Sequence, residues 1–188
     1  FKLRHICVFS IKKLMKSKKN IVFLGMMGSG KTSIGSLVSK KLKLNFIDTD
    51  QKIEEELGMS IVKIFEKKGE KFFREFEEKI TLRLLKKKDV VVALGGGAFL
   101  NKNIRNEILS NHFSIWLKWK NDTIIKRITN SVKRPVALKS SKVELFDLIE
   151  KRSNIYSKAL YKIECDNLKK IQITKKVLEI YKNKKNNS

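Results

Sequence analysis

The sequence has few cysteines, which cross-link small domains or bind metal clusters, and it has no long apolar run of the kind that crosses a membrane. Two cysteines, Cys7 and Cys165, in 188 residues are too few for a disulfide framework or a cysteine metal cluster. No apolar run approaches the roughly 18 to 20 residues of a membrane helix. Aromatic RNA-binding signatures, helix-turn-helix patterns and zinc-ligand spacings are missing too. We therefore expect a cytoplasmic protein with no membrane partner and no specific nucleic-acid partner.

Internal repeats and domain linkers are also missing, and the length suits one domain with a substantial core. We expect a single domain over residues 20–183, a polar tail at 184–188 and a monomer. Residues 1–19 mix basic and apolar side chains; with a short apolar stretch and no small-residue cleavage site, they favour a dispensable extension over a targeting peptide. The only proline, Pro135, lies in a polar segment at about 130–141, which we expect to be a mobile lid.

Arginine is scarce in a strongly basic chain. The formal net charge is +24, which is typical of proteins that bind nucleic acid or anionic membranes. The lysines, however, are spread over predicted helices, turns and both termini, so we interpret most of them as solvated surface that binds anions nonspecifically. The seven arginines are the more informative group, because the planar guanidinium group can donate two parallel hydrogen bonds to a carboxylate or a phosphate.

Short apolar runs alternate with amphipathic segments along the chain. This pattern predicts an α/β fold of three layers, with a central five-stranded parallel sheet flanked by helices. The predicted strands are 21–24, 45–48, 90–94, 113–117 and 161–165. The predicted helices are 31–42, 51–57, 61–68, 70–87, 104–110, 123–129, 142–159 and 171–182.

The first predicted strand leads into a glycine-rich phosphate-loop motif. Residues 25–32, with the sequence GMMGSGKT, fit the pattern G-x-x-x-x-G-K-[ST] and are followed by a predicted helix. Backbone N–H groups and the positive helix end would face phosphate oxygens. Lys31 would reach the β and γ phosphates, and the Thr32 hydroxyl would ligate Mg²⁺. The alternative is a glycine-rich turn without a ligand.

Two aspartates close the second predicted strand, as Asp48-Thr49-Asp50. At the carboxyl edge of a parallel sheet, where ligands bind, residues two apart on a strand would face the same side. One carboxylate could then face Mg²⁺ and its waters, and the other a substrate hydroxyl. Alternatively, Asp50 caps the following helix. The residues alone leave both interpretations open.

Three glycines and an arginine pair provide further candidates. Gly95, Gly96 and Gly97 follow the third predicted strand, where they could offer bare N–H donors to a ligand or simply form a flexible strand exit. Arg74 and Glu77 lie one helical turn apart. They could form a surface pair or a carboxylate clamp oriented by Glu77, and the sequence does not decide between these.

Taken together, these motifs resemble the shikimate kinase family. The resemblance covers residues 20 to about 166 and rests on motifs in the family's order and spacing. They are the phosphate loop, Asp48-Thr49-Asp50, Phe73-Arg74-x-x-Glu77, Gly95-Gly96-Gly97, Arg134-Pro135 and Arg152-x-x-x-Tyr156.

The resemblance implies a role for each matching residue. For ATP, it implies binding by the phosphate loop and two arginines: Gly28, Ser29, Gly30, Lys31, Thr32, Ser33, Arg127 on the adenine, and Arg134 on the lid. For shikimate, it implies binding by Asp50, Arg74, Gly95, Gly96, Gly97 and Arg152. Thr32, and Asp48 through water, would hold Mg²⁺. Asp50 would be the base candidate, and Lys31 and Arg134 would stabilise the transferring phosphoryl group.

The reaction implied is Mg²⁺-dependent transfer of the ATP γ-phosphate to the 3-hydroxyl of shikimate, a step of chorismate and aromatic amino acid biosynthesis. The expected partners are ATP and shikimate. A rival interpretation is another small P-loop kinase, acting on gluconate or a nucleoside monophosphate. A rival of a different class is a non-catalytic protein that binds nucleotides or nucleic acid through its basic surface.

Overall fold

The structure is a computed structural model that describes residues 20–130 and 141–186. The predicted extension at 1–19 lies outside these residues. So does most of the predicted lid, with Arg134 and Pro135.

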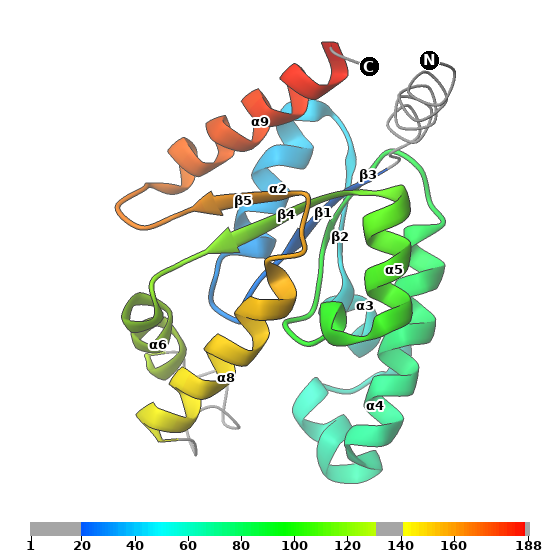
Figure 1. Ribbon diagram of the computed structural model, residues 1–188. Coiled ribbons are helices and arrows are strands. Elements are labelled where there is room, and N and C mark those ends of the chain that lie inside the picture. The colour runs from blue at the N-terminus through cyan, green and yellow to red at the C-terminus, as the bar shows by residue number, and fades with distance from the viewer. Residues whose placement is uncertain (1–19, 131–140, 187–188) are drawn as a thin grey trace, which may run out of the picture.

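Five parallel strands form one sheet, in the order β2-β3-β1-β4-β5 (Figure 1). Their bounds are β1 Ile21–Leu24, β2 Asn45–Asp48, β3 Val90–Ala93, β4 Phe113–Lys118 and β5 Tyr161–Glu164. The predicted five-stranded parallel sheet is confirmed, and each strand ends within one residue of its prediction. β1 and β3 are buried along their whole length, whereas buried and more exposed positions alternate in the edge strand β5. Helices on both faces of the sheet explain why its inner strands are continuously apolar.

The helices connect the strands and cover both faces of the sheet. They are α2 Lys31–Leu42, α3 Thr49–Leu57, α4 Ile61–Leu85, α5 Lys102–Asn111, α6 Asn121–Thr129, α8 Lys142–Tyr156 and α9 Lys170–Asn186, with the 3₁₀ helix η1 Ala98–Leu100. In Figure 1, α2 and α9 lie together on one side of the sheet, and α5 and α8 lie on the other. Gly35 lets α2 approach the sheet closely, because a Cβ there would lie 2.7 Å from the Phe46 ring.

The helices predicted at 61–68 and 70–87 are confirmed as two helical segments of α4, because the backbone between them is non-helical at Gly69, where φ is 79° and ψ is 169°. Several predicted helix ends were wrong, for local reasons. α5 begins two residues early because the Asn101 side chain accepts hydrogen bonds from the N–H groups of Asn103 and Ile104. α8 ends at Tyr156, three residues before the prediction, and η1 was not predicted.

The carboxyl ends of all five strands lie at one edge of the sheet, as parallel pairing requires. Asp48 ends β2 there, and the phosphate loop, Gly95–Gly97 and Trp119 follow the ends of β1, β3 and β4. In the part of the chain that the structure describes, no helix is both long and apolar enough to cross a membrane.

Candidate active site

The phosphate loop joins β1 to α2 and bends through glycines with positive φ. The φ values of Gly25, Gly28 and Gly30 are 138°, 79° and 91°, a region that glycine adopts without strain. Lys31 folds back over the loop, and its Nζ donates to the carbonyls of Gly25 at 2.9 Å and Met26 at 3.0 Å. These contacts hold a buried ammonium group at the loop that begins α2.

The start of α2 suits anions. Its N-cap residue, Gly30, makes no side-chain capping hydrogen bond, so no side chain covers the first N–H groups of the helix. These groups and the positive end of the helix dipole form a site for phosphate oxygens. Of the predicted ATP-binding residues, Thr32 and Ser33 are exposed in the first turn, and Ser29 is buried below.

Thr32 and Asp48 lie side by side, and together they suit a magnesium ion. The Thr32 hydroxyl donates to Asp48 Oδ2 at 2.6 Å. Within the described ranges, no cluster of three or more His, Cys, Asp or Glu residues could hold a metal. A hydroxyl beside one carboxylate nevertheless fits Mg²⁺, because this ion keeps several waters and takes few protein ligands beside nucleotide phosphates.

Asp48, not Asp50, caps α3. Its Oδ1 accepts hydrogen bonds from the N–H groups of Asp50 at 3.0 Å and Gln51 at 3.4 Å. The alternative in which Asp50 is the cap is therefore wrong. The strand-alternation argument for the two aspartates was also wrong, because β2 ends at Asp48 and Asp50 lies in the first turn of α3. Helix capping turns the chain at this point and sends Asp50 toward the third strand.

The Asp50 carboxyl lies over Gly95, at the end of β3. A Cβ at Gly95 would overlap Asp50 Oδ1 and would lie 2.9 Å from Glu77 Oε1. Burial raises the pKa of Asp50 to about 6; the nearby Lys31 ammonium opposes this rise, and the carboxylates of Asp48 and Glu77 add to it. A carboxyl with this pKa can exchange a proton near neutral pH.

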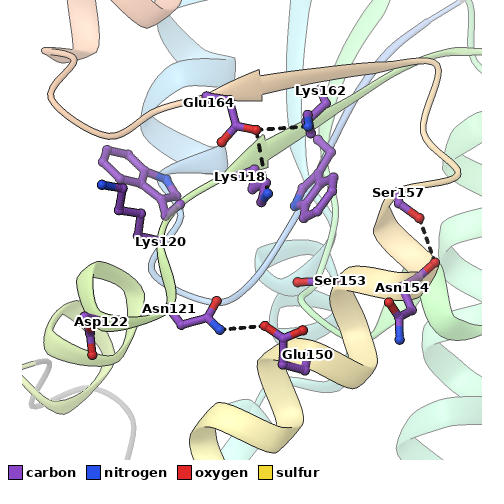
Figure 2. A pocket seen from close by; sticks show the side chains of 12 residues that line it. Lys118, Lys120, Asn121, Asp122, Glu150, Ser153, Asn154, Ser157, Lys162 and Glu164 are labelled. Carbon is purple, nitrogen blue, oxygen red and sulfur yellow. Dashed lines mark hydrogen bonds and ion pairs between the residues drawn. The ribbon is translucent and has the colours of Figure 1, made fainter.

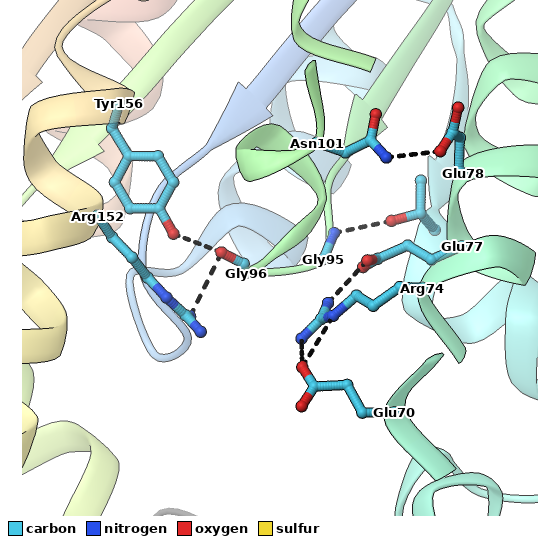
Figure 3. Close-up of polar contacts among 10 residues, drawn as sticks. Glu70, Arg74, Glu77, Glu78, Gly95, Gly96, Asn101, Arg152 and Tyr156 are labelled. Carbon is cyan, nitrogen blue, oxygen red and sulfur yellow. Dashed lines mark hydrogen bonds and ion pairs between the residues drawn. The ribbon is translucent and has the colours of Figure 1, made fainter. Parts of the chain in front are cut away.

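Arg74 projects from α4 toward Gly97, with two carboxylates around it. Its Nη1 donates to Glu77 at 2.7 Å, and its Nε and Nη2 donate to Glu70, each at 3.2 Å (Figure 3). Only 2% of Glu77 is exposed, so this is no surface pair. Burial raises the pKa of Glu77, and the positive charges of Arg74 and Arg152 oppose that rise. Glu77 thus fixes the direction of the Arg74 guanidinium.

Gly95 and Gly97 make room for charged side chains, and Gly96 lies beside a third. Gly95 faces Asp50, as described above. A Cβ at Gly96 would lie 3.7 Å from Arg152 Nη1 and 3.4 Å from the backbone N of Met27 in the phosphate loop. A Cβ at Gly97 would lie 2.5 Å from Arg74 Nη1. The glycine segment is therefore packed between the phosphate loop and two arginines, which a merely flexible strand exit would not require.

Arg127 contacts Trp119, which in turn contacts the phosphate loop. Its guanidinium lies 3.5 Å above the ring of Trp119, and the Trp119 indole N–H donates to the Ser29 carbonyl at 2.9 Å. Trp119 is buried whereas Arg127 is exposed. Ser29, the Trp119 indole and the Arg127 guanidinium therefore contact one another in this order, beginning at the phosphate loop.

Comparisons with known proteins agree with this site. The sequence model described as shikimate kinase matches residues 27–182. The chain belongs to the shikimate kinase family. Shikimate kinase of Bacillus subtilis is 42% identical over 173 residues, covering 88% of this chain and 90% of that protein. Shikimate kinase of Bartonella quintana is 41% identical, covering 83% and 76%.

Solved structures agree with the family assignment. Shikimate kinase from Acinetobacter baumannii in complex with shikimate superimposes with a TM-score of 0.82 at 30% identity, covering 91% of this chain and 97% of that one. A gluconokinase from Sinorhizobium meliloti reaches only a TM-score of 0.52 at 15% identity, a likeness of fold alone. The protein is thus an ATP-dependent phosphotransferase of the shikimate kinase family, and the gluconate kinase rival loses its support.

A cavity of about 750 Å³ lies between α6, α8 and the ends of β4 and β5, and Trp119 is part of its lining (Figure 2). None of the predicted site residues lines it. Three of its charged groups pair with one another: Glu164 binds Lys162 at 2.9 Å and Lys118 at 3.6 Å. The family's motifs therefore gather at the sheet edge and not in this hollow.

Sequence reasoning gave no role to Trp119, Glu70 or Tyr156, although all three contact predicted site residues. The position of Trp119 directly after β4, at the same sheet edge as the other motifs, was a usable signal. Glu70, four residues before Arg74, was a usable i,i+4 signal. The contact of Tyr156 with Gly96 joins residues 60 apart in the chain, and no local pattern reveals such a contact.

Proposed function

We propose that this member of the shikimate kinase family transfers the γ-phosphoryl group of ATP to the 3-hydroxyl of shikimate through the residues described above. The observation that carries the proposal is the packing of Gly95, Gly96 and Gly97 against Asp50, Arg152 and Arg74, with the phosphate loop beside Gly96. A base candidate, two carboxylate-binding guanidinium groups and a phosphate-binding loop thereby converge on three consecutive residues. Phosphoryl transfer needs chiefly such positioning, together with charge neutralisation.

The phosphate loop binds the donor in this proposal. The N–H groups at the start of α2 bind phosphate oxygens, and Lys31 neutralises charge on the β and γ phosphates. Thr32, and Asp48 through water, would hold Mg²⁺, which supplies further charge neutralisation when bound. The hydrogen bond between Thr32 and Asp48 keeps both oxygens at the same point before a metal arrives.

Asp50, the glycines and the arginines bind the acceptor. Asp50 accepts the proton of the attacking hydroxyl, and its pKa of about 6 leaves it ionised at neutral pH yet more basic than an exposed aspartate. Arg74 and Arg152 bind the carboxylate of shikimate as bidentate or paired donors. N–H groups of the glycine segment bind ring hydroxyls.

Two further arginines complete the ATP site in the proposal. Arg127 stacks on adenine with the face that does not touch Trp119. Arg134, outside the described residues, closes over the phosphates from the lid and excludes water, which would otherwise compete for the phosphoryl group. We propose that the enzyme acts as a cytoplasmic monomer.

Shikimate-dependent release of ADP tests this function. Wild-type protein with ATP and Mg²⁺ is expected to release ADP when shikimate is added, and not when gluconate or a nucleoside monophosphate is added. ADP release with gluconate alone would support the rival kinase. Salt-sensitive DNA binding without shikimate-dependent turnover would support the non-catalytic alternative.

The arginine clamp is tested by Arg74→Ala. Loss of a charge-assisted pair of about 2 to 3 kcal/mol should raise the KM for shikimate roughly 30- to 150-fold, while the KM for ATP stays within about twofold. Arg83→Ala is the matched control, because Arg83 lies on the same helix and pairs with Glu56 at the surface. Equal increases in both KM values for Arg74→Ala would contradict the clamp.

A further inference from the structure

The hydroxyl of Tyr156 lies deep in the protein and points at the glycine segment. Only 1% of Tyr156 is exposed. Its hydroxyl donates to the Gly96 carbonyl and has the Met26 sulfur at 3.9 Å as a second, weaker neighbour (Figure 3). Burial raises the pKa of Tyr156 to about 12, so the phenol keeps its proton near neutral pH. Tyr156 is therefore a permanent donor to one backbone carbonyl.

The same carbonyl is also the hydrogen-bond partner of Arg152. Arg152 Nη1 donates to the Gly96 oxygen at 3.5 Å, a long bond, and Arg152 Nε is buried without a hydrogen-bond partner in the described parts of the chain. A carbonyl oxygen can accept two donors. Because the bond from Arg152 is long, the shorter bond from Tyr156 is the one that holds the carbonyl.

Fixing this carbonyl also fixes the next N–H group. The Gly96 carbonyl and the Gly97 N–H belong to one planar trans peptide and point in opposite directions. The carbonyl is directed at α8, which carries Arg152 and Tyr156. The N–H is thereby directed away from α8. Figure 3 shows Arg152 and Tyr156 on one side of Gly96 and Arg74 on the other. The Ala98 N–H closes the turn by donating to the Gly95 carbonyl at 3.2 Å, but two glycines inside a turn still allow the peptide between them to rotate.

We propose that Tyr156 is a positioning residue for the acceptor site. Its hydroxyl locks the Gly96–Gly97 peptide so that the Gly97 N–H points away from α8, to the side of Arg74, and it keeps the Gly96 oxygen in place as an anchor for Arg152. This inference rests on the proposed function, because it assigns the locked N–H group to a hydroxyl of the bound acceptor. Tyr156 itself contacts no substrate in this arrangement.

Tyr156→Phe tests the proposal, because it removes the hydroxyl and keeps the ring that packs on Trp116. The KM for shikimate should rise about 3- to 10-fold, the effect of about one net hydrogen bond. The KM for ATP and kcat should each stay within about twofold, because the phosphate loop loses only the weak contact of the hydroxyl with the Met26 sulfur and Asp50 keeps its contacts. The ratio of mutant to wild-type KM should stay constant from neutral pH upward, since the phenol does not titrate there.

Tyr161→Phe is the matched control. Tyr161 stacks on Phe113 at 4.8 Å and lies in β5, away from the glycine segment, so its variant should keep wild-type kinetics. Assays run below the melting temperature of the less stable variant. An unchanged KM for shikimate in Tyr156→Phe, or equal increases in both KM values, would overturn the proposal.

The remaining outcomes are equally decisive. Failure of Tyr156→Phe to fold would overturn the proposal, because the hydroxyl would then support the core as a whole. If wild-type protein shows shikimate-dependent ADP release but Tyr156→Phe has the same kcat and the same KM for shikimate and for ATP, only the positioning role of Tyr156 fails. If the wild type shows none, the proposed function fails as well.

Discussion

Replacing Asp50 by asparagine should make the protein more stable and less active. The pKa of Asp50 is about 6 in the folded chain, against an ordinary value of 3.8, with burial as the largest cause. A difference of about two units corresponds to roughly 3 kcal/mol of unfolding free energy. This is the cost of holding an ionised carboxylate over Gly95, and a neutral amide of the same shape avoids it.

The sign of the pH dependence follows from proton binding. Above pH 6 the carboxyl is ionised in both the folded and unfolded states, so the full cost is present. Between pH 6 and about 4 the folded state binds a proton that the unfolded state does not, and wild-type stability rises relative to the variant as the pH falls. Asp50→Asn should therefore exceed wild type by up to about 3 kcal/mol near pH 8, with little difference near pH 4.

Urea unfolding across this pH range measures the effect. Asp147→Asn is the control, since Asp147 is exposed on α8 and its replacement should change stability by less than about 0.5 kcal/mol. In kinetic assays Asp50→Asn should lose about 10²- to 10⁴-fold in kcat, and wild-type kcat/KM for shikimate should be about tenfold lower at pH 5 than at pH 8. An Asn variant that is less stable than wild type at pH 8, or a stability difference independent of pH, would refute the reasoning.

Two further predictions concern the ATP side of the site. Thr32→Ala removes the hydroxyl that donates to Asp48 and should raise the Mg²⁺ concentration needed for half-maximal activity by about tenfold. Thr32→Ser keeps the hydroxyl and should stay close to wild type. Equal Mg²⁺ dependence of all three proteins would argue against Thr32 as a metal ligand. Arg127→Ala should raise the KM for ATP about fivefold, as the loss of about 1 kcal/mol of stacking implies, without changing the KM for shikimate. Lys126→Ala serves as its control, because Lys126 is an exposed neighbour on α6. A similar effect of both substitutions would indicate that only general positive charge had been lost.

Local chemistry made most of the fold predictable. The buried strands β1 and β3 are uninterrupted apolar runs, and all five strands could be placed from the sequence to within a residue of their ends. The phosphate loop was equally accessible, because glycines, a lysine and a threonine at fixed spacing form a structure determined by adjacent residues. Helix ends were harder, since the side chains of Asp48 and Asn101 decide where α3 and α5 begin and a sequence offers several competing caps.

The sequence by itself thus determined the α/β class, the position of the phosphate loop and the set of candidate residues. Only the tertiary structure decided which of them meet. Because the strands lie in the order β2-β3-β1-β4-β5, Gly96 reaches Tyr156, and Trp119 reaches Ser29, across 60 and 90 residues of chain. The raised pKa of Asp50 has the same origin. It depends on burial and on charges that separate elements bring together, and no stretch of neighbouring residues contains that information.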